Sequence, residues 1–171
     1  MFKIRKKDLL SVSDLSTEEF RQILSLAQKL KDENHNGINR PYLAGKTLGM
    51  LFMKPSTRTR ISFEVGMYQL GGHALYLASS ELQLARGETI ADTAKVLSRY
   101  LHGVLARVHS HDYLRDLARN SDIPVINGLS DLEHPCQAIS DIFTVLEKRK
   151  LLRGLKIAFI GDANNVANSL M

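Results

Sequence analysis

Short apolar runs and amphipathic stretches alternate along the chain from residue 46 onward, and this alternation constrains the fold more than any other feature. The apolar runs, which predict buried strands, lie at residues 47–53, 73–78, 104–108, 124–127 and 155–160. The stretches that predict helices lie between them, at residues 58–70, 89–101, 112–119 and 134–150. Strands that alternate with helices across short turns are typical of βαβ units. The sequence therefore predicts an α/β fold, in which a parallel sheet is flanked by helices.

A further helix is predicted ahead of the first strand. Ser16 and Glu19 have the spacing of a capping box, in which each side chain binds a backbone N–H of the other residue. Apolar residues then recur at helical spacing, as Phe20, Ile23, Leu24, Ala27 and Leu30. We expect polar loops at residues 34–41 and 79–88, and we expect Asp112 to cap the helix that it begins.

The chain divides near residue 150. Residues 149–154 are a plausible hinge, because the predicted strand at 155–160 begins directly after them. The sequence then ends at Met171, within the first turns of another predicted helix. We therefore expect one domain at residues 1–150 and the beginning of a second α/β domain at residues 151–171, as part of a protein about twice as long.

The charge of the chain favours small anionic partners. Its 171 residues carry 23 Lys and Arg against 18 Asp and Glu, a formal net charge of +5. The cationic residues form no block and no basic arm, so no nucleic-acid partner is expected. A small anionic substrate fits the same charge.

Cysteine usage and hydropathy indicate a protein of the reducing cytoplasm. Cys136 is the only cysteine, so the chain can form no internal disulfide and no cysteine cluster for a metal. Lys3, Arg5, Lys6 and Lys7 near the N-terminus are followed by Asp8 and by no long apolar region, so we expect no signal peptide. No stretch approaches the roughly 18 apolar residues of a membrane span.

Residues 54–60, KPSTRTR, stand between a predicted strand and a predicted helix. Ser and Thr are common there because their hydroxyls cap free backbone N–H groups. Two arginines are unusual, because the start of a helix already carries about half a positive charge. A bound anion would resolve this conflict, since the N–H groups, the hydroxyls and a guanidinium all bind oxyanions. The segment therefore predicts an oxyanion site, most simply one for a phosphate group.

Two other features fall at carboxyl ends of predicted strands, where open parallel sheets bind ligands. Arg107 closes the strand at 104–108, and His134 with Gln137 follows the strand that ends near Asn127. Taken singly, a lone Arg is often a surface ion pair, and a His before Pro is often a helix cap. Together the groups fit a bound acyl phosphate that carries an amide nitrogen. Each arginine would bind two phosphate oxygens through its guanidinium group. His134 would donate a hydrogen bond to the carbonyl oxygen, and the side-chain oxygen of Gln137 would accept one from the NH2 group.

Three segments, in this order along the chain, resemble the aspartate/ornithine carbamoyltransferase family. Residues 52–64, FMKPSTRTRISFE, are similar to its carbamoyl phosphate signature, and residues 87–94, GETIADTA, to its next block. Residues 126–137, INGLSDLEHPCQ, resemble the ornithine branch, which has Cys where the aspartate branch tends to have Thr. The resemblance covers essentially the whole chain. It implies the carbamoyl phosphate-binding fold of that family.

The resemblance also implies roles for individual residues. The phosphate would be held by Ser56, Thr57, Arg58, Thr59 and Arg107. The carbonyl would be polarised by Arg107, His134 and Thr59, while Gln137 would hold the carbamoyl nitrogen. Gln83 would reach a neighbouring subunit's site, which implies a trimer or a multiple of trimers. Arg86 would either join it there or be a solvated charge of the loop. Asn165 would contact ornithine, although Ala163 departs from the glycine usual in the family's GDGNN-like segment.

The implied reaction is transfer of the carbamoyl group of carbamoyl phosphate to the δ-amine of ornithine, in arginine biosynthesis, with no cofactor and no metal. Two alternatives stay open. One is a carbamoyltransferase whose acceptor is N-acetylornithine, putrescine or another amine, and the other is a non-catalytic anion-binding module. The sequence contains neither a Ser-His-Asp set nor metal-ligand spacing.

Several other polar residues are expected to have structural roles only. Arg60 has the helical spacing to pair with Glu64. We expect Cys136 to be a small buried filler beside the site, and His109 and His111 to be exposed to solvent. Asp131 is expected only to cap or brace the helix that follows it.

Overall fold

A computed structural model describes residues 4–171 and contains a four-stranded parallel sheet. The strands are β1 (Thr47–Phe52), β2 (His73–Ala78), β3 (Gly103–Arg107) and β4 (Val125–Leu129). Their order across the sheet is β2-β1-β3-β4, and every neighbouring pair is parallel. The α/β fold predicted from the alternation of runs is therefore confirmed. Since all four strands point the same way, their carboxyl ends meet at one edge of the sheet.

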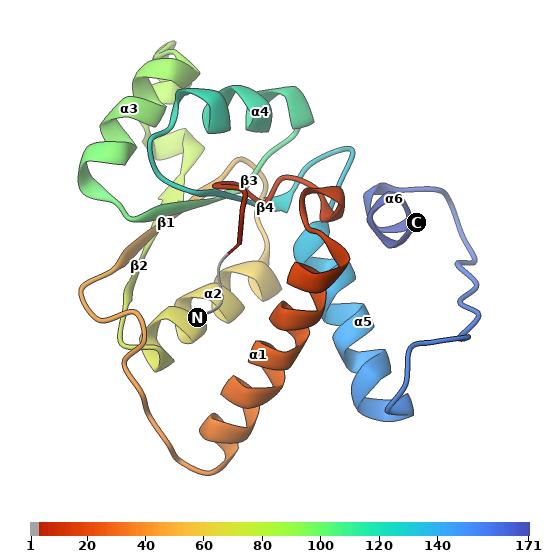
Figure 1. The fold of residues 1–171 in the computed structure, drawn as a ribbon. Coiled ribbons are helices and arrows are strands. Elements are labelled where there is room, and N and C mark those ends of the chain that lie inside the picture. Colours follow the sequence, from red (N-terminus) through yellow and green to blue (C-terminus); the bar gives the residue numbers. More distant parts are fainter. Residues whose placement is uncertain (1–3) are drawn as a thin grey trace.

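The helices cover both faces of this sheet (Figure 1). Their bounds are α1 (Thr17–His35), α2 (Thr57–Gln69), α3 (Ile90–Tyr100), α4 (His111–Asn120), α5 (Pro135–Arg149) and α6 (Asn165–Leu170). Helices α3 and α4 lie on one face, and α1, α2 and α5 lie on the other. Within residues 4–171, every helix is too short or too polar to cross a lipid bilayer.

Strand β1 is apolar from Leu48 to Phe52, which suits a strand whose two faces are both covered. Leu51 packs into the core beneath α3 and α4, whereas Met50 and Phe52 pack into the core beneath α2. All three side chains are buried. Gly49 leaves room for Leu101, since a Cβ there would lie 2.4 Å from Cδ1 of Leu101 and would displace the end of that side chain. Continuous burial of this kind is what distinguishes a central parallel strand from a half-exposed one.

The N-terminal segment adds to the free edge of β4. The N–H of Leu9 donates to the carbonyl of Val125 at 2.9 Å, and its carbonyl accepts from the N–H of Asn127 at 2.8 Å. A 3₁₀ turn (Val12–Asp14) then leads into α1. At the start of α1, the predicted capping box of Ser16 and Glu19 is confirmed. Hydrogen bonds from Ser16 and from the N–H of Arg5 hold the pKa of Glu19 at about 2.

The strand predicted at residues 155–160 is absent from the structure. The segment is irregular, and its apolar side chains are exposed, from 40% for Leu155 to 95% for Ile160. No described strand runs beside it. Because a strand is stable only when its N–H and C=O groups are paired, an apolar run without a neighbour forms none. The division into domains at residue 150 stays a prediction.

Smaller predictions of local structure were also wrong. Ser110, not Asp112, caps α4, since its hydroxyl accepts from the N–H of Asp112 at 3.2 Å. Strand β4 continues to Leu129, two residues beyond its predicted end. The polar loop after β2 contains two 3₁₀ turns, at Ser79–Glu81 and Gln83–Arg86.

Candidate anion-binding site

The residues predicted to form the site meet at the carboxyl edge of the sheet. A hollow of about 440 Å³ lies there, between the ends of β1, β3 and β4 and the helices that follow them. The predicted residues that line it are Ser56, Arg58, Thr59, Arg107, His134, Gln137 and Asn165. It is also lined by Leu129, Asp141, Phe159, Asn164 and Val166. The sheet thus brings together the groups of the rim prediction, from Ser56 to Gln137, which are separated by as many as 81 residues of sequence.

The first part of the hollow is the start of α2. Ser56 caps the helix, because its hydroxyl accepts from the N–H of Thr59 at 3.3 Å and donates to the Thr59 hydroxyl at 3.1 Å. Thr57 and Arg58 occupy the first two helical positions, where a helix supplies no acceptor for the backbone N–H. These N–H groups, together with the positive end of the helix dipole, favour an anion.

Arg58 and Arg107 bring two positive charges to the same hollow. Among residues 4–171, neither guanidinium forms an ion pair, and Nε of Arg107 is buried without a hydrogen-bond partner. Burial lowers the pKa of Arg107, and the charge of Arg58 lowers it further. Arginine nevertheless stays protonated in proteins. Two cations that line the same hollow without ion-pair partners among the described residues form a site suited to a multiply charged oxyanion.

His134 presents a free imidazole to the hollow. It occupies the cap position of α5, directly before Pro135, but its side chain makes no capping hydrogen bond. Nδ1 is buried and has no partner among the described residues. Burial lowers the pKa of His134, and Arg107 lowers it further, against a smaller opposing effect of Asp141. The ring is therefore neutral at pH 7 and carries one N–H donor, so the alternative that it merely caps the helix does not hold.

Asp141 fixes the orientation of Gln137, and sequence analysis did not single it out. Nε2 of Gln137 donates to Oδ1 of Asp141 at 2.8 Å. Because a carboxylate only accepts, the amide nitrogen of Gln137 must face Asp141, and its carbonyl oxygen stays available to accept an N–H. The signal in the sequence was the four-residue spacing, which places the two side chains on one face of a helix.

Three predicted site residues do not line the hollow. Thr57 contributes its place at the start of α2, but its side chain is exposed and is not part of the lining. Gln83 and Arg86 are exposed on the 3₁₀ turn that follows β2, outside the hollow. Within a single chain, Gln83 and Arg86 therefore lie outside the candidate site.

Asn165 does line the hollow, from the first position of α6. Its Nδ2 donates to the carbonyl of Ser130 at 2.6 Å. Asn164 caps the helix, because its Oδ1 accepts from the N–H groups of Val166 at 3.0 Å and Ala167 at 3.1 Å. The short helix thus places Asn165 opposite the residues of the sheet edge.

The expected exposure of His111 was wrong, whereas His109 is exposed as predicted. His111 is buried, and its Nδ1 lies 2.8 Å from the hydroxyl of Ser130. Asp131 accepts from the backbone N–H of His111 at 2.8 Å, so it braces the start of α4 and not the helix that follows it. The contact was invisible in the sequence because the two partners lie 19 or more residues apart and follow different strands.

Arg60 and Cys136 have the structural roles expected of them. Arg60 pairs with Glu64 at 3.0 Å, as predicted. The thiol of Cys136 donates to the carbonyl of Asn127 at 3.4 Å, and burial raises its pKa to about 11. A protonated thiol packed against a strand has the character of a filler and not of a nucleophile.

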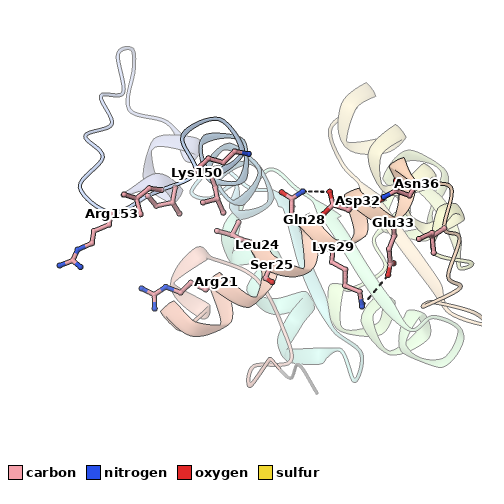
Figure 2. A pocket seen from close by; sticks show the side chains of 14 residues that line it. Arg21, Leu24, Ser25, Gln28, Lys29, Asp32, Glu33, Asn36, Lys150 and Arg153 are labelled. Atoms are coloured by element: carbon pink, nitrogen blue, oxygen red, sulfur yellow. Dashed lines mark hydrogen bonds and ion pairs between the residues drawn. The ribbon is translucent and has the colours of Figure 1, made fainter.

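A larger hollow of about 900 Å³ lies between α1 and the end of α5, and some of its polar groups pair with one another (Figure 2). Nε2 of Gln28 donates to Asp32 at 2.8 Å, and Nζ of Lys29 lies 3.9 Å from Glu33. Its other cations, Arg21, Lys150 and Arg153, come from α1 and from residues 150–153. The hollow thus lies away from the carboxyl edge of the sheet, where open parallel sheets bind ligands.

Comparisons with known proteins agree with this geometry. A family model described as the carbamoyl phosphate-binding domain of aspartate/ornithine carbamoyltransferases matches residues 7–147. The ornithine carbamoyltransferase of Methanocorpusculum labreanum is 58% identical over 97% of this chain and 54% of its own length, and that of Thermococcus kodakarensis is 58% identical over 96% and 52%. The solved ornithine carbamoyltransferase of Pyrococcus furiosus superposes with a TM-score of 0.93 at 54% identity, over 96% of this chain and 52% of that one. The chain thus spans about half the length of the relatives it matches.

Proposed function

The chain belongs to the aspartate/ornithine carbamoyltransferase family, and from this premise we propose that it supplies the carbamoyl phosphate site of an ornithine carbamoyltransferase. One observation carries the proposal: two arginines without acidic partners share a hollow with a neutral His134 and an oriented Gln137. A phosphate alone would need only the arginines and the helix start. The histidine and the glutamine fit an attached carbamoyl group.

The phosphate is held by the start of α2 together with β3. The hydroxyls and N–H groups of residues 56–59 bind its oxygens, and Arg58 and Arg107 neutralise its charge. Each charge-assisted hydrogen bond of this type contributes about 1.5–3 kcal/mol. Thr57 takes part through its backbone N–H at the helix start.

The carbamoyl group is polarised and oriented by four residues. His134, Arg107 and Thr59 donate to its carbonyl oxygen, and Oε1 of Gln137 accepts from its NH2 group. The neutral δ-amine of ornithine attacks the carbonyl carbon, and the C–N bond forms as the π electrons move to oxygen. The same donors stabilise this oxyanion. The C–O bond to phosphate then breaks, and the new nitrogen loses a proton, which gives citrulline and phosphate. The chemistry needs positioning and charge but no cofactor.

Ornithine is the acceptor that the relatives' names support, and Asn165 is the residue of this chain placed to contact it. Its position on the same hollow as His134 supports this role. N-acetylornithine and putrescine are the alternative acceptors, and a non-catalytic anion-binding module is the alternative function. These three alternatives would use the same anion site. They differ in the residues that lie opposite that site.

A homotrimer, or a multiple of one, fits the surface around β2. This strand is an edge of the sheet, and exposed apolar side chains flank it, namely Ile61, Val65 and Tyr68 on α2, Leu75 on β2, and Val96 and Tyr100 on α3. The turn that carries Gln83 follows the same strand. Another copy packed on this edge would cover the apolar residues and receive Gln83 in its own site. The proposed setting is arginine biosynthesis in the cytoplasm.

An assay of a full-length protein that carries residues 1–171 tests the function. We expect citrulline from carbamoyl phosphate and ornithine, and no product with N-acetylornithine or putrescine. Arg58→Ala should abolish turnover, whereas the matched Arg60→Ala should retain it, because Arg60 is paired with Glu64 outside the hollow. The isolated 171-residue chain should have negligible turnover. A folded full-length protein with no carbamoyl transfer to any of the three amines would contradict the proposal.

A further inference from the structure

The segment that carries His134 is attached to α6 by a row of hydrogen bonds. Nδ2 of Asn165 donates to the carbonyl of Ser130 at 2.6 Å, and Nδ2 of Asn168 donates to the carbonyl of Leu132 at 3.0 Å. Ser169 makes the third contact. These residues stand at positions i, i+3 and i+4 of the helix, so they share one face. That whole face of α6 is therefore directed at the loop before α5.

Ser169 binds the backbone of His134 itself. The peptide N–H of His134 donates to Oγ of Ser169 at 2.8 Å, and the same hydroxyl donates to Oε2 of Glu133. The direction of both bonds is fixed, because a carboxylate only accepts and a peptide N–H only donates. The Ser169 side chain is buried, with 6% of the residue exposed. The hydroxyl thus forms a bridge between two consecutive residues of the loop.

Glu133 connects this bridge to the N-terminal segment. Its Oε1 accepts from the hydroxyl of Ser11 at 3.1 Å, and Ser11 caps the 3₁₀ turn before α1. The Glu133 carboxylate therefore joins three pieces of the chain that are far apart in sequence. Nothing in the proposed chemistry uses Glu133 or Ser169, and neither lines the hollow.

We propose that Glu133 and Ser169 are positioning residues for His134, and that they set the place of its imidazole relative to the phosphate-binding residues. The inference rests on the proposed function, in which His134 contacts the carbamoyl carbonyl. His134 occupies the cap position of α5, so a shift of its backbone moves the ring directly. The start of α2 and Arg107 are held by other elements. Loss of the bridge therefore weakens contact with the carbamoyl group and spares the phosphate contacts.

Calorimetric titration of the 171-residue chain with carbamoyl phosphate and with inorganic phosphate measures this difference. Ser169→Ala should lower the preference for carbamoyl phosphate over phosphate by about fivefold to tenfold, the effect of one lost hydrogen bond. Phosphate affinity itself should not change. Ser169→Thr, which keeps the hydroxyl, should restore the preference, and Glu133→Gln should lower it in the same direction. Ser140→Ala, at an exposed serine of α5, is the matched control.

Hydrogen exchange at the His134 peptide N–H gives a readout that does not depend on the ligand. It should be faster in Ser169→Ala than in the unsubstituted chain, and unchanged in Ser140→Ala. If the unsubstituted chain prefers carbamoyl phosphate but Ser169→Ala keeps both that preference and slow exchange, the positioning role is overturned and the proposed function stands. If the unsubstituted chain shows no preference, the proposed function fails, and the exchange rate alone decides whether Ser169 holds His134.

Discussion

Two apolar runs of similar length and composition adopt different structures in this molecule. Thr47–Phe52 forms β1, which pairs on both sides and is almost completely buried. Residues 155–160 form no strand and expose their apolar side chains. The difference lies in the neighbours, because β2 and β3 flank the first run and no described strand flanks the second. The comparison teaches that an apolar run specifies a strand only where the rest of the chain provides the partners.

The same contrast separates two parts of the site. Arg107 and residues 56–59 take their positions from strands that are packed on both faces. Asn165 and Ser169 take theirs from hydrogen bonds between a six-residue helix and the loop at Ser130–His134. The groups proposed for the phosphate thus rest on the core, whereas the group proposed for ornithine rests on a few polar contacts.

Hydrogen exchange should show the largest difference between the two apolar runs. Amides of Thr47–Phe52 exchange only when the domain unfolds, so we expect protection factors above about 10³, in line with domain stabilities of 5–15 kcal/mol. Amides of residues 155–160 should exchange nearly as fast as in an unstructured peptide. Mass spectrometry or NMR measures both in one sample. Equal protection of the two runs from hydrogen exchange would contradict the conclusion that only the first run forms a stable strand.

Matched leucine substitutions come next in size. Leu51→Ala should lower the free energy of unfolding by about 2–5 kcal/mol, because it leaves a cavity in a fully buried site. Leu155→Ala removes the same atoms from a residue that is 40% exposed and should cost less than about 1 kcal/mol. Denaturant unfolding followed by circular dichroism compares the two. Similar losses of stability would mean that Leu155 packs more closely than the structure indicates.

Phosphate affinity should separate the two parts of the site. Arg58→Ala should abolish measurable binding of phosphate or carbamoyl phosphate, or weaken it by about tenfold to a hundredfold, because a charge-assisted contact is lost. Its circular dichroism spectrum should not change. Asn165→Ala should leave phosphate affinity within about twofold. Calorimetry measures both variants, and undiminished binding by Arg58→Ala would place the anion elsewhere.

The smallest effect is the dependence of stability on pH, and it should arise in residues 4–150 only. All six histidines lie before residue 150, and burial lowers the pKa of His111 and of His134 below the usual 6.5. Between the lowered pKa and 6.5, the unfolded chain binds more protons than the folded one. Stability should therefore fall as the pH drops below about 6.5, by at most about 1.4 kcal/mol per pH unit for each histidine.

The variant His111→Asn tests the source of that slope. It removes one titrating ring while it keeps a polar side chain near Ser130. We expect a shallower loss of stability between pH 6.5 and 5 than in the unsubstituted chain. A slope unchanged by this substitution would assign the effect to other groups.

The sequence contained most of the fold and the centre of the site, for physical reasons. Burial on both faces makes a parallel strand a continuous apolar run, so β1 could be recognised before its neighbours were known. The arginines at the start of α2 stood out because they break a local rule of helix electrostatics. By contrast, the burial of His111 and the Ser169 bridge depend on partners that are 19 to 36 residues away. Such contacts leave no periodic signal, and neither does the absence of a neighbouring strand at residues 155–160.

Calorimetric titration of the purified 171-residue chain with carbamoyl phosphate, with inorganic phosphate as the comparison, tests the central claim most directly. The claim is that the carboxyl edge of the four-stranded sheet binds carbamoyl phosphate through Arg58, Arg107, His134 and Gln137. It predicts saturable binding at one site, tighter than that of phosphate, and loss of that binding in Arg107→Ala. Equal affinity for the two ligands, or binding that survives Arg107→Ala in a folded chain, would contradict it.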